Sequence, residues 1–111
     1  MSANGVENGE STEMSVTSLD ETAVDADPSA IVHESGPRTV FLSLDADETI
    51  PGHRHPESTV LFHVLSGTVT LTVGDETREL TEGDVARFDG TREVSPRATT
   101  SANALVILVE T

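Results

Sequence analysis

The sequence predicts an all-β fold, either a sandwich or a small barrel. From about residue 38 onward, short runs of β-branched and other apolar residues alternate with turn residues such as Gly and Asp. No long window has the 3.6-residue apolar period of an amphipathic helix. Residues 1–28 differ from the rest, because they contain seven acids, no basic residue and almost no large apolar side chain.

We expect residues 1–28 to form a disordered acidic tail, since such a segment cannot bury enough apolar surface to offset its ordering entropy. The remaining 83 residues, 29–111, form one domain with a small core and little stability to spare. Association through an apolar sheet face would add stability, so a homodimer is expected. Met14 is an alternative start to Met1, which would leave the first thirteen residues outside the native protein.

Seven strands are expected in the domain. They cover residues 38–45, 58–65, 68–73, 77–80, 85–88, 91–98 and 104–110. The run 58–65 is apolar on both faces and is therefore predicted to be a central strand. The run 68–73 alternates threonine with valine or leucine, which predicts one buried and one polar face. Gly74, Gly83 and Gly90 each stand beside an aspartate and mark the turns between the later strands.

The chain is strongly acidic. Its formal net charge of −14 comes from 20 acids and six basic residues, and all six basic residues are arginine. Without a basic patch the chain cannot displace counterions from phosphates, so binding to nucleic acid is not expected. Anionic membranes are excluded on the same ground. A lysine-free, aromatic-poor, acidic chain fits a halophilic protein, whose self-repulsion is screened by salt.

The N-terminal residues, the apolar stretches and the cysteine content bear on cellular location and redox chemistry. The first ten residues have neither a basic start nor an apolar run, and no apolar stretch reaches the length of a membrane span. The chain has no cysteine, which excludes disulfides, thiolate chemistry and cysteine-based zinc sites. We therefore expect a cytoplasmic protein.

Two blocks of sequence resemble a known family. Residues 51–55 read Pro-Gly-His-Arg-His and precede an apolar strand that ends at Ser66-Gly67, and residues 83–85, Gly-Asp-Val, lead into Asp89-Gly90. This order is similar to the two conserved blocks of the cupin superfamily in its small single-domain form, over roughly residues 38–110. The resemblance implies an antiparallel jelly-roll β-barrel preceded by the acidic tail, and the composition adds a haloarchaeal source.

The resemblance also implies a divalent metal inside the barrel, held by two histidines and a glutamate of the first block and a histidine of the second. His53 and His55 stand at the positions of the first two histidines. Residues i and i+2 of an extended segment share a face, so both rings can point to one ion. The glutamate position falls on Val60, or on Thr59 with the shorter spacing, and neither side chain is an anionic ligand.

The second block lacks the third histidine. Counting from Gly83 reaches Val94, whereas counting from Gly90 reaches Glu93. We prefer the second count, which makes Glu93 the substitute ligand, although adjacent strand residues point to opposite faces and Val94 in the interior would leave Glu93 outside. Two imidazoles and one carboxylate suit zinc, iron, manganese or nickel. One such metal, or none, is therefore expected.

Four further residues are candidates for the site. Glu57 could turn back toward the histidines as a ligand, or remain a solvated loop acid. Arg87 and Arg97 could receive an anionic ligand, because guanidinium binds carboxylate through two parallel hydrogen bonds. His63 shares a strand face with leucines, and a packed core histidine is the alternative to a ligand-binding one.

Two functions follow from these residues. The first is a cupin that binds a small polar molecule at the barrel mouth, beside a weak or degenerate metal site. The second is a metal-dependent cupin enzyme of the dioxygenase, isomerase or decarboxylase type, since the fold alone does not choose a reaction. A partner-binding domain that uses its acidic tail is a third hypothesis. No residue is assigned a catalytic role, because the chain has no nucleophile on a strand-to-helix elbow.

Overall fold

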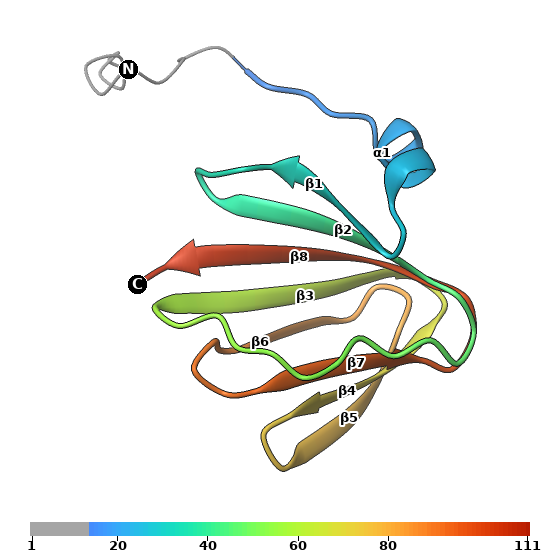
Figure 1. Cartoon of the computed structure of the whole chain (residues 1–111), viewed down its shortest axis with the longest axis vertical. Coiled ribbons are helices and arrows are strands. Elements are labelled where there is room, and N and C mark those ends of the chain that lie inside the picture. Colours follow the sequence, from blue (N-terminus) through green and yellow to red (C-terminus); the bar gives the residue numbers. More distant parts are fainter. Residues whose placement is uncertain (1–13) are drawn as a thin grey trace.

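Two antiparallel sheets lie face to face and enclose the core (Figure 1). The structure is a computed structural model, and it describes residues 14–111. Its elements are α1 (Leu19–Asp25), β1 (Ser29–His33), β2 (Arg38–Leu44), β3 (Ser58–Ser66), β4 (Thr68–Val73), β5 (Glu76–Thr81), β6 (Val85–Asp89), β7 (Val94–Ala98) and β8 (Ala102–Glu110). The larger sheet has the order β1-β2-β8-β3-β6 and the smaller has the order β5-β4-β7. The expected all-β jelly-roll barrel is confirmed.

The central strands of the larger sheet are β3 and β8, which pair along almost their whole length. On β3 the side chains of Val60, Phe62 and Val64 are buried between the sheets, whereas Leu61 and His63 point to the outer face and are half-buried. The apolar character of both faces predicted this central position. It did not by itself indicate which face would point inward.

The smaller sheet is covered on one side only. On β4, Val69, Leu71 and Val73 are buried against the larger sheet, and the intervening threonines face outward. The neighbouring strand β5 is an edge strand and is exposed along most of its length. The alternation of β4 in the sequence therefore matches its burial residue by residue.

Two elements were not expected. Helix α1 falls within the segment that the sequence predicted to be disordered, and it contacts β1 and β2. Ser18 caps the helix by accepting a hydrogen bond from the backbone N–H of Glu21 at 3.5 Å, and the acids in the first turn suit the helix dipole. Residues 1–13 of the expected tail lie outside the described residues.

The second unexpected element is β1, which pairs with β2 at the edge of the larger sheet. Its five residues are too short and too mixed in polarity to show an alternating pattern, and a bulge lies between Ile31 and His33. Strand β7 is also shorter than expected, because the carboxylate of Asp89 accepts hydrogen bonds from the N–H and the hydroxyl of Thr91, both at 2.9 Å. In the part of the chain that is described, no helix is long and apolar enough to cross a membrane.

Leu44 tests the importance of the core between the sheets. Its side chain is 3% exposed and belongs to the buried cluster. Leu44→Ala should lower the free energy of unfolding by about 2–5 kcal/mol, since it removes buried apolar surface and leaves a cavity. Urea denaturation measures the change. Val85→Ala is the control, because Val85 is 58% exposed, and the same loss in both variants would contradict this location of the core.

Candidate functional site

A cavity of about 390 Å³ opens between the two sheets and contains both histidines of the first block. It is lined by Pro28, Ser29, Arg38, Val40, Leu42, Ile50, His53, His55, Val60, Phe62, Phe88, Val94, Pro96, Val106 and Leu108. Most of these side chains are apolar, and only three of the side chains carry or can acquire a positive charge. A cavity with apolar walls and a few polar groups is typical of a small-molecule site.

His53 is positioned by the backbone of β7. Its N–H donates to the carbonyl of Val94 at 3.1 Å, and the N–H of Val94 donates back to the carbonyl of His53 at 2.8 Å. Directly opposed residues of an antiparallel pair present their side chains to the same face. Val94 is buried and lines the cavity, so His53 points into it as well.

His55 is positioned by the turn after β6. Its N–H donates to the carbonyl of Gly90 at 2.7 Å, and the N–H of Gly90 donates to the carbonyl of Ser58 at 2.8 Å. A Cβ atom at Gly90 would collide with the carbonyl oxygen of His55. Glycine at this turn therefore lets the loop with the histidines approach the second block closely.

The two imidazole rings lie edge to face. Their centroids are 4.7 Å apart and their planes are inclined by 87°. Nδ1 of His53 is 3.1 Å from the carbonyl oxygen of Pro51, and a carbonyl can only accept, so this contact is a hydrogen bond in the tautomer with Nδ1–H as the donor. This leaves Nε2 of His53 with a lone pair that can accept a proton or bind a metal.

The residues of the site do not fit the full metal set of the cupin family. In residues 14–111, no group of three or more His, Cys, Asp or Glu side chains is arranged to hold a metal ion. Val60 lines the cavity at the position where the family has its glutamate, and Val94 lines it at a position for the third histidine. A stable metal centre needs at least one more protein ligand than two imidazoles supply. The apolar side chains of Val60 and Val94 therefore stand where the glutamate and the third histidine of the metal set would be.

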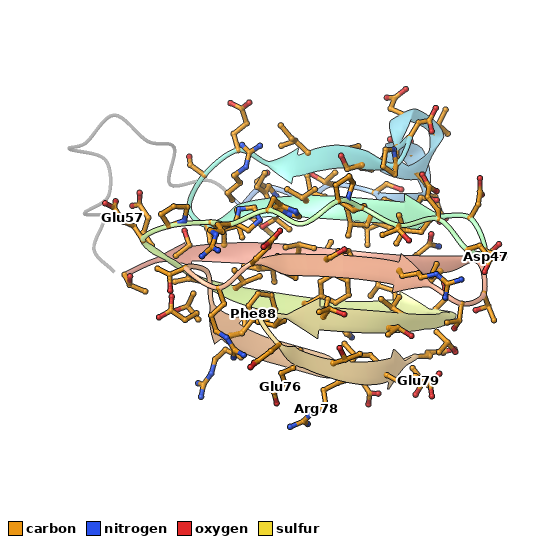
Figure 2. The ribbon with its side chains drawn as sticks, turned by 60° about the horizontal axis from the view of Figure 1, so that its bottom comes forward. Asp47, Glu57, Glu76, Arg78, Glu79 and Phe88 are labelled. Atoms are coloured by element: carbon orange, nitrogen blue, oxygen red, sulfur yellow. The ribbon has the colours of Figure 1, made fainter. Side chains whose placement is uncertain are left out.

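The structure does not bring the two candidate carboxylates to the histidines. Glu93 precedes Val94 and is exposed, with its side chain against Gly52 and outside the cavity lining. Glu57 is exposed as well, and its carbonyl accepts a hydrogen bond from the N–H of Thr111 at 2.9 Å. Figure 2 shows Glu57 and Asp47 at opposite ends of the molecule.

The other three candidates also lie away from the cavity. Arg97 is on β7 and forms an ion pair with Asp47 at 2.9 Å. His63 and Arg87 belong to the outer face of the larger sheet, because Phe62 and Phe88, their neighbours in sequence, line the cavity. Their roles as ligand-binding residues stay predictions, and the cavity that contains the histidines gives them no support.

The sequence reasoning missed Arg38, the first residue of β2. Arg38 has the same strand parity as Val40 and Leu42, and all three line the cavity. The alternation was visible in the sequence, but Thr39 and Phe41 on the opposite face are buried too. Parity alone therefore did not distinguish the inner face of this strand from the outer one.

The surroundings of His55 oppose its protonation. Partial burial lowers the pKa of His55 below its ordinary value of 6.5, and the charges of His53 and Arg38 lower it further. The unfolded chain binds the proton more readily than the folded chain does. Above pH 6.5, His55 is neutral in both states and does not reduce the free energy of unfolding. As the pH falls from 6.5 through the lowered pKa of His55, the unfolded chain takes up the proton first, and the free energy of unfolding decreases.

Titration of the histidines by NMR should show this effect. His55 should titrate below 6.5, and Arg38→Gln should raise its pKa, because one of the three causes is removed. Arg87→Gln is the matched control, since Arg87 is an arginine of the same sheet on the opposite face, and it should leave the titration unchanged. A pKa of His55 at or above its ordinary value would contradict this geometry.

Comparisons with known proteins agree with this architecture. The cupin domain family matches residues 40–110. Among the curated proteins, none matches the chain.

Several solved structures share the fold. A conserved protein with a double-stranded β-helix domain from Klebsiella pneumoniae is 19% identical, with a TM-score of 0.77 over 88% of this chain and 91% of that one. An RmlC-like cupin from Desulfovibrio desulfuricans is 26% identical, with a TM-score of 0.68 over 73% and 79%. A predicted oxalate decarboxylase from Thermotoga maritima is 16% identical, with a TM-score of 0.68 over 75% and 79%. By its family match and its fold, the chain belongs to the cupin domain family.

Proposed function

We propose that this cupin domain binds a small organic molecule in the cavity beside His53 and His55, and that it does not depend on a resident metal. The observation that carries the proposal is the cavity itself, which has an apolar lining and only two imidazoles in place of the family's metal set. Val60 and Val94 make the remaining positions hydrophobic. Burial of apolar surface against these side chains stabilises a bound organic ligand, whereas apolar side chains offer no donor atom to a metal ion.

The imidazoles give the cavity its polar recognition. With its proton on Nδ1, His53 offers Nε2 as an acceptor. His55 is neutral around pH 7, because its pKa is lowered, so one of its nitrogens donates and the other accepts. The pair can therefore hydrogen-bond to a hydroxyl, carbonyl or carboxyl group of a ligand.

A metal-dependent cupin enzyme is the second candidate. One observation favours it: the carbonyl of Pro51 holds His53 in the tautomer that leaves Nε2 for a metal. The name of the Thermotoga maritima structure suggests a decarboxylase, but at 16% identity it supports the fold alone. No further ligand among residues 14–111 completes the set, so this candidate ranks second.

Metal analysis separates the two functions. The native chain, purified without added metal, should carry far less than one equivalent of zinc, iron, manganese or nickel. Dialysis against EDTA should leave its melting temperature unchanged, because no folding energy comes from a metal. A double variant, His53→Ala with His55→Ala, tests the site, and His63→Ala on the outer face is the control. About one equivalent of metal that disappears only in the double variant would establish the enzyme-type centre instead.

We also propose that the chain is adapted to high salt, as in a halophilic or haloarchaeal protein. The support is the net charge of −14 without a single lysine. Raising KCl from 0.1 M to 1 M shortens the Debye length from about 10 Å to about 3 Å. The melting temperature should rise over this range, whereas sucrose at equal osmolality should have a smaller effect. Equal stability at low and high salt would contradict the adaptation.

A further inference from the structure

The cavity that contains His53 and His55, here called the mouth cavity, has a charge opposite to that of the chain. The chain has 20 acidic residues, yet among residues 14–111 no aspartate or glutamate lines this cavity. Its ionisable side chains are Arg38, His53 and His55. A cleft lined by one sign of charge between low-dielectric walls concentrates ligands of the opposite sign. The ionisable lining of the cavity therefore suits an anion, in a protein whose net charge repels anions.

Arg38 supplies the permanent charge of the cavity, and its guanidinium is not neutralised by the described residues. No carboxylate oxygen of residues 14–111 lies within 4.0 Å of it, and it makes no side-chain hydrogen bond there. Glu34 and Glu110 line the adjoining surface groove together with Arg38, but neither forms an ion pair with it. Arg38 thus presents unused donors at the edge of an apolar cavity.

Most of the other arginines are engaged. Arg78 and Arg92 pair with Glu76, Arg97 pairs with Asp47, and Arg54 donates to the carbonyl of Thr91. Arg87 resembles Arg38 in having no ion pair among the described residues, but it is absent from the lining of this cavity and lines a separate cavity between β5 and β6. Arg38 is therefore distinguished by its place at the cavity, and Arg87 is its natural control.

The strand register shows how the cavity extends from Arg38. Arg38 pairs with Leu108, Leu108 with Val60, and Val60 with Phe88, so these four residues form one row across β2, β8, β3 and β6. All four line the cavity. Three interstrand spacings of about 4.8 Å separate the ends of the row by about 14 Å. The row has a cation at one end, aliphatic side chains in the middle and an aromatic ring at the other end.

Phe88 closes the far end of the row. A second cavity of about 370 Å³ lies between β5 and β6, and Phe88 lines this cavity as well as the first. No other residue of the described chain lines both. In Figure 2 Phe88 lies inward of Glu76, Arg78 and Glu79 on β5. Phe88 is therefore the residue of the described chain through which a smaller side chain could connect the two cavities.

We propose that the ligand is a short-chain carboxylate with an apolar body, whose carboxylate binds the Arg38 guanidinium and whose length is limited by Phe88. This inference rests on the proposed function and names its ligand class. A planar guanidinium matches one carboxylate through two parallel hydrogen bonds, and the body lies over Leu108 and Val60. The volume of about 390 Å³ holds on the order of ten non-hydrogen atoms, since one water occupies about 30 Å³.

A series of probes tests the ligand class by calorimetry on the full chain, at the lowest salt that keeps it folded. The probes are butyrate, hexanoate, octanoate and decanoate, with hexanamide and hexylamine as neutral and cationic counterparts. Hexanoate should bind better than either counterpart of the same length. Arg38→Gln should weaken hexanoate at least tenfold and leave hexanamide unchanged, and Arg87→Gln should change neither. Equal binding of hexanoate and hexanamide, or of hexanoate by both arginine variants, would overturn the role of Arg38.

The role of Phe88 is tested with the same series. Phe88→Ala should move the best-bound chain length from octanoate, which has ten non-hydrogen atoms, toward decanoate, because the second cavity becomes available to the tail. Phe88→Leu is the second variant, which keeps a large aliphatic side chain and protects the fold, and it should shift the preference less. Circular dichroism confirms that each variant is folded. An unchanged length preference in folded Phe88→Ala would overturn this role of Phe88.

The outcome also separates this inference from the proposed function. If hexanamide or hexylamine binds in the cavity and the carboxylates do not, the ligand class is wrong and small-molecule binding stands. If no probe of any charge shifts the NMR signals of the cavity histidines, the carboxylate inference is overturned. About one equivalent of metal on His53 and His55 would overturn the proposed function itself.

Discussion

The mouth cavity depends on backbone hydrogen bonds that hold the segment before β3 along the edge of β7. The N–H of Asp47 donates to the carbonyl of Ala98 at 2.7 Å, and the N–H of Ile50 donates to that of Pro96 at 3.0 Å. The reciprocal pair of His53 and Val94 continues this ladder. Without this segment the edge of β7 would expose unpaired backbone groups and the cavity would lose one wall.

The same hydrogen bonds explain why the histidines are well placed while the rest of the metal set is absent. Pairing with β7 and contact with Gly90 orient the backbone of the loop, whatever side chains the neighbouring strands carry. The side chains at the other ligand positions, on the neighbouring strands, do not depend on these backbone hydrogen bonds. Here they are Val60 and Val94. The backbone arrangement that would present a cupin metal site is therefore present, but apolar side chains line the site. Such a lining accommodates hydrocarbon better than an ion.

The acidic surface and the cavity act on an anion in opposite directions. The net charge of −14 repels an anion at long range, whereas Arg38 attracts it at short range. Salt screens interactions between exposed charges beyond the Debye length, so it weakens the long-range repulsion more than a direct contact of an anion with the exposed Arg38 guanidinium. High salt would thus lower the barrier to approach and keep part of the attraction at the cavity. The halophilic composition and an anion-binding cavity are therefore compatible in one molecule.

By itself, the sequence determined the all-β fold class and the seven strands from β2 to β8, and the resemblance of its two blocks to a known family implied the jelly-roll barrel. The strands follow from local patterns, namely strand alternation and Gly-Asp turns. Helix α1 and β1 were missed, because a helix of seven residues and a strand of five have little local signal and gain their stability from packing.

Only the tertiary structure decided which residues face the cavity. Both faces of β2 carry buried side chains, so strand parity could group Arg38 with Val40 and Leu42 but could not say which group points inward. The register across four strands then placed Arg38 and Phe88 at the two ends of one row. Strand pairing aligned these two residues, which are 50 positions apart in the chain, and such pairing of distant segments has no signature in the local sequence.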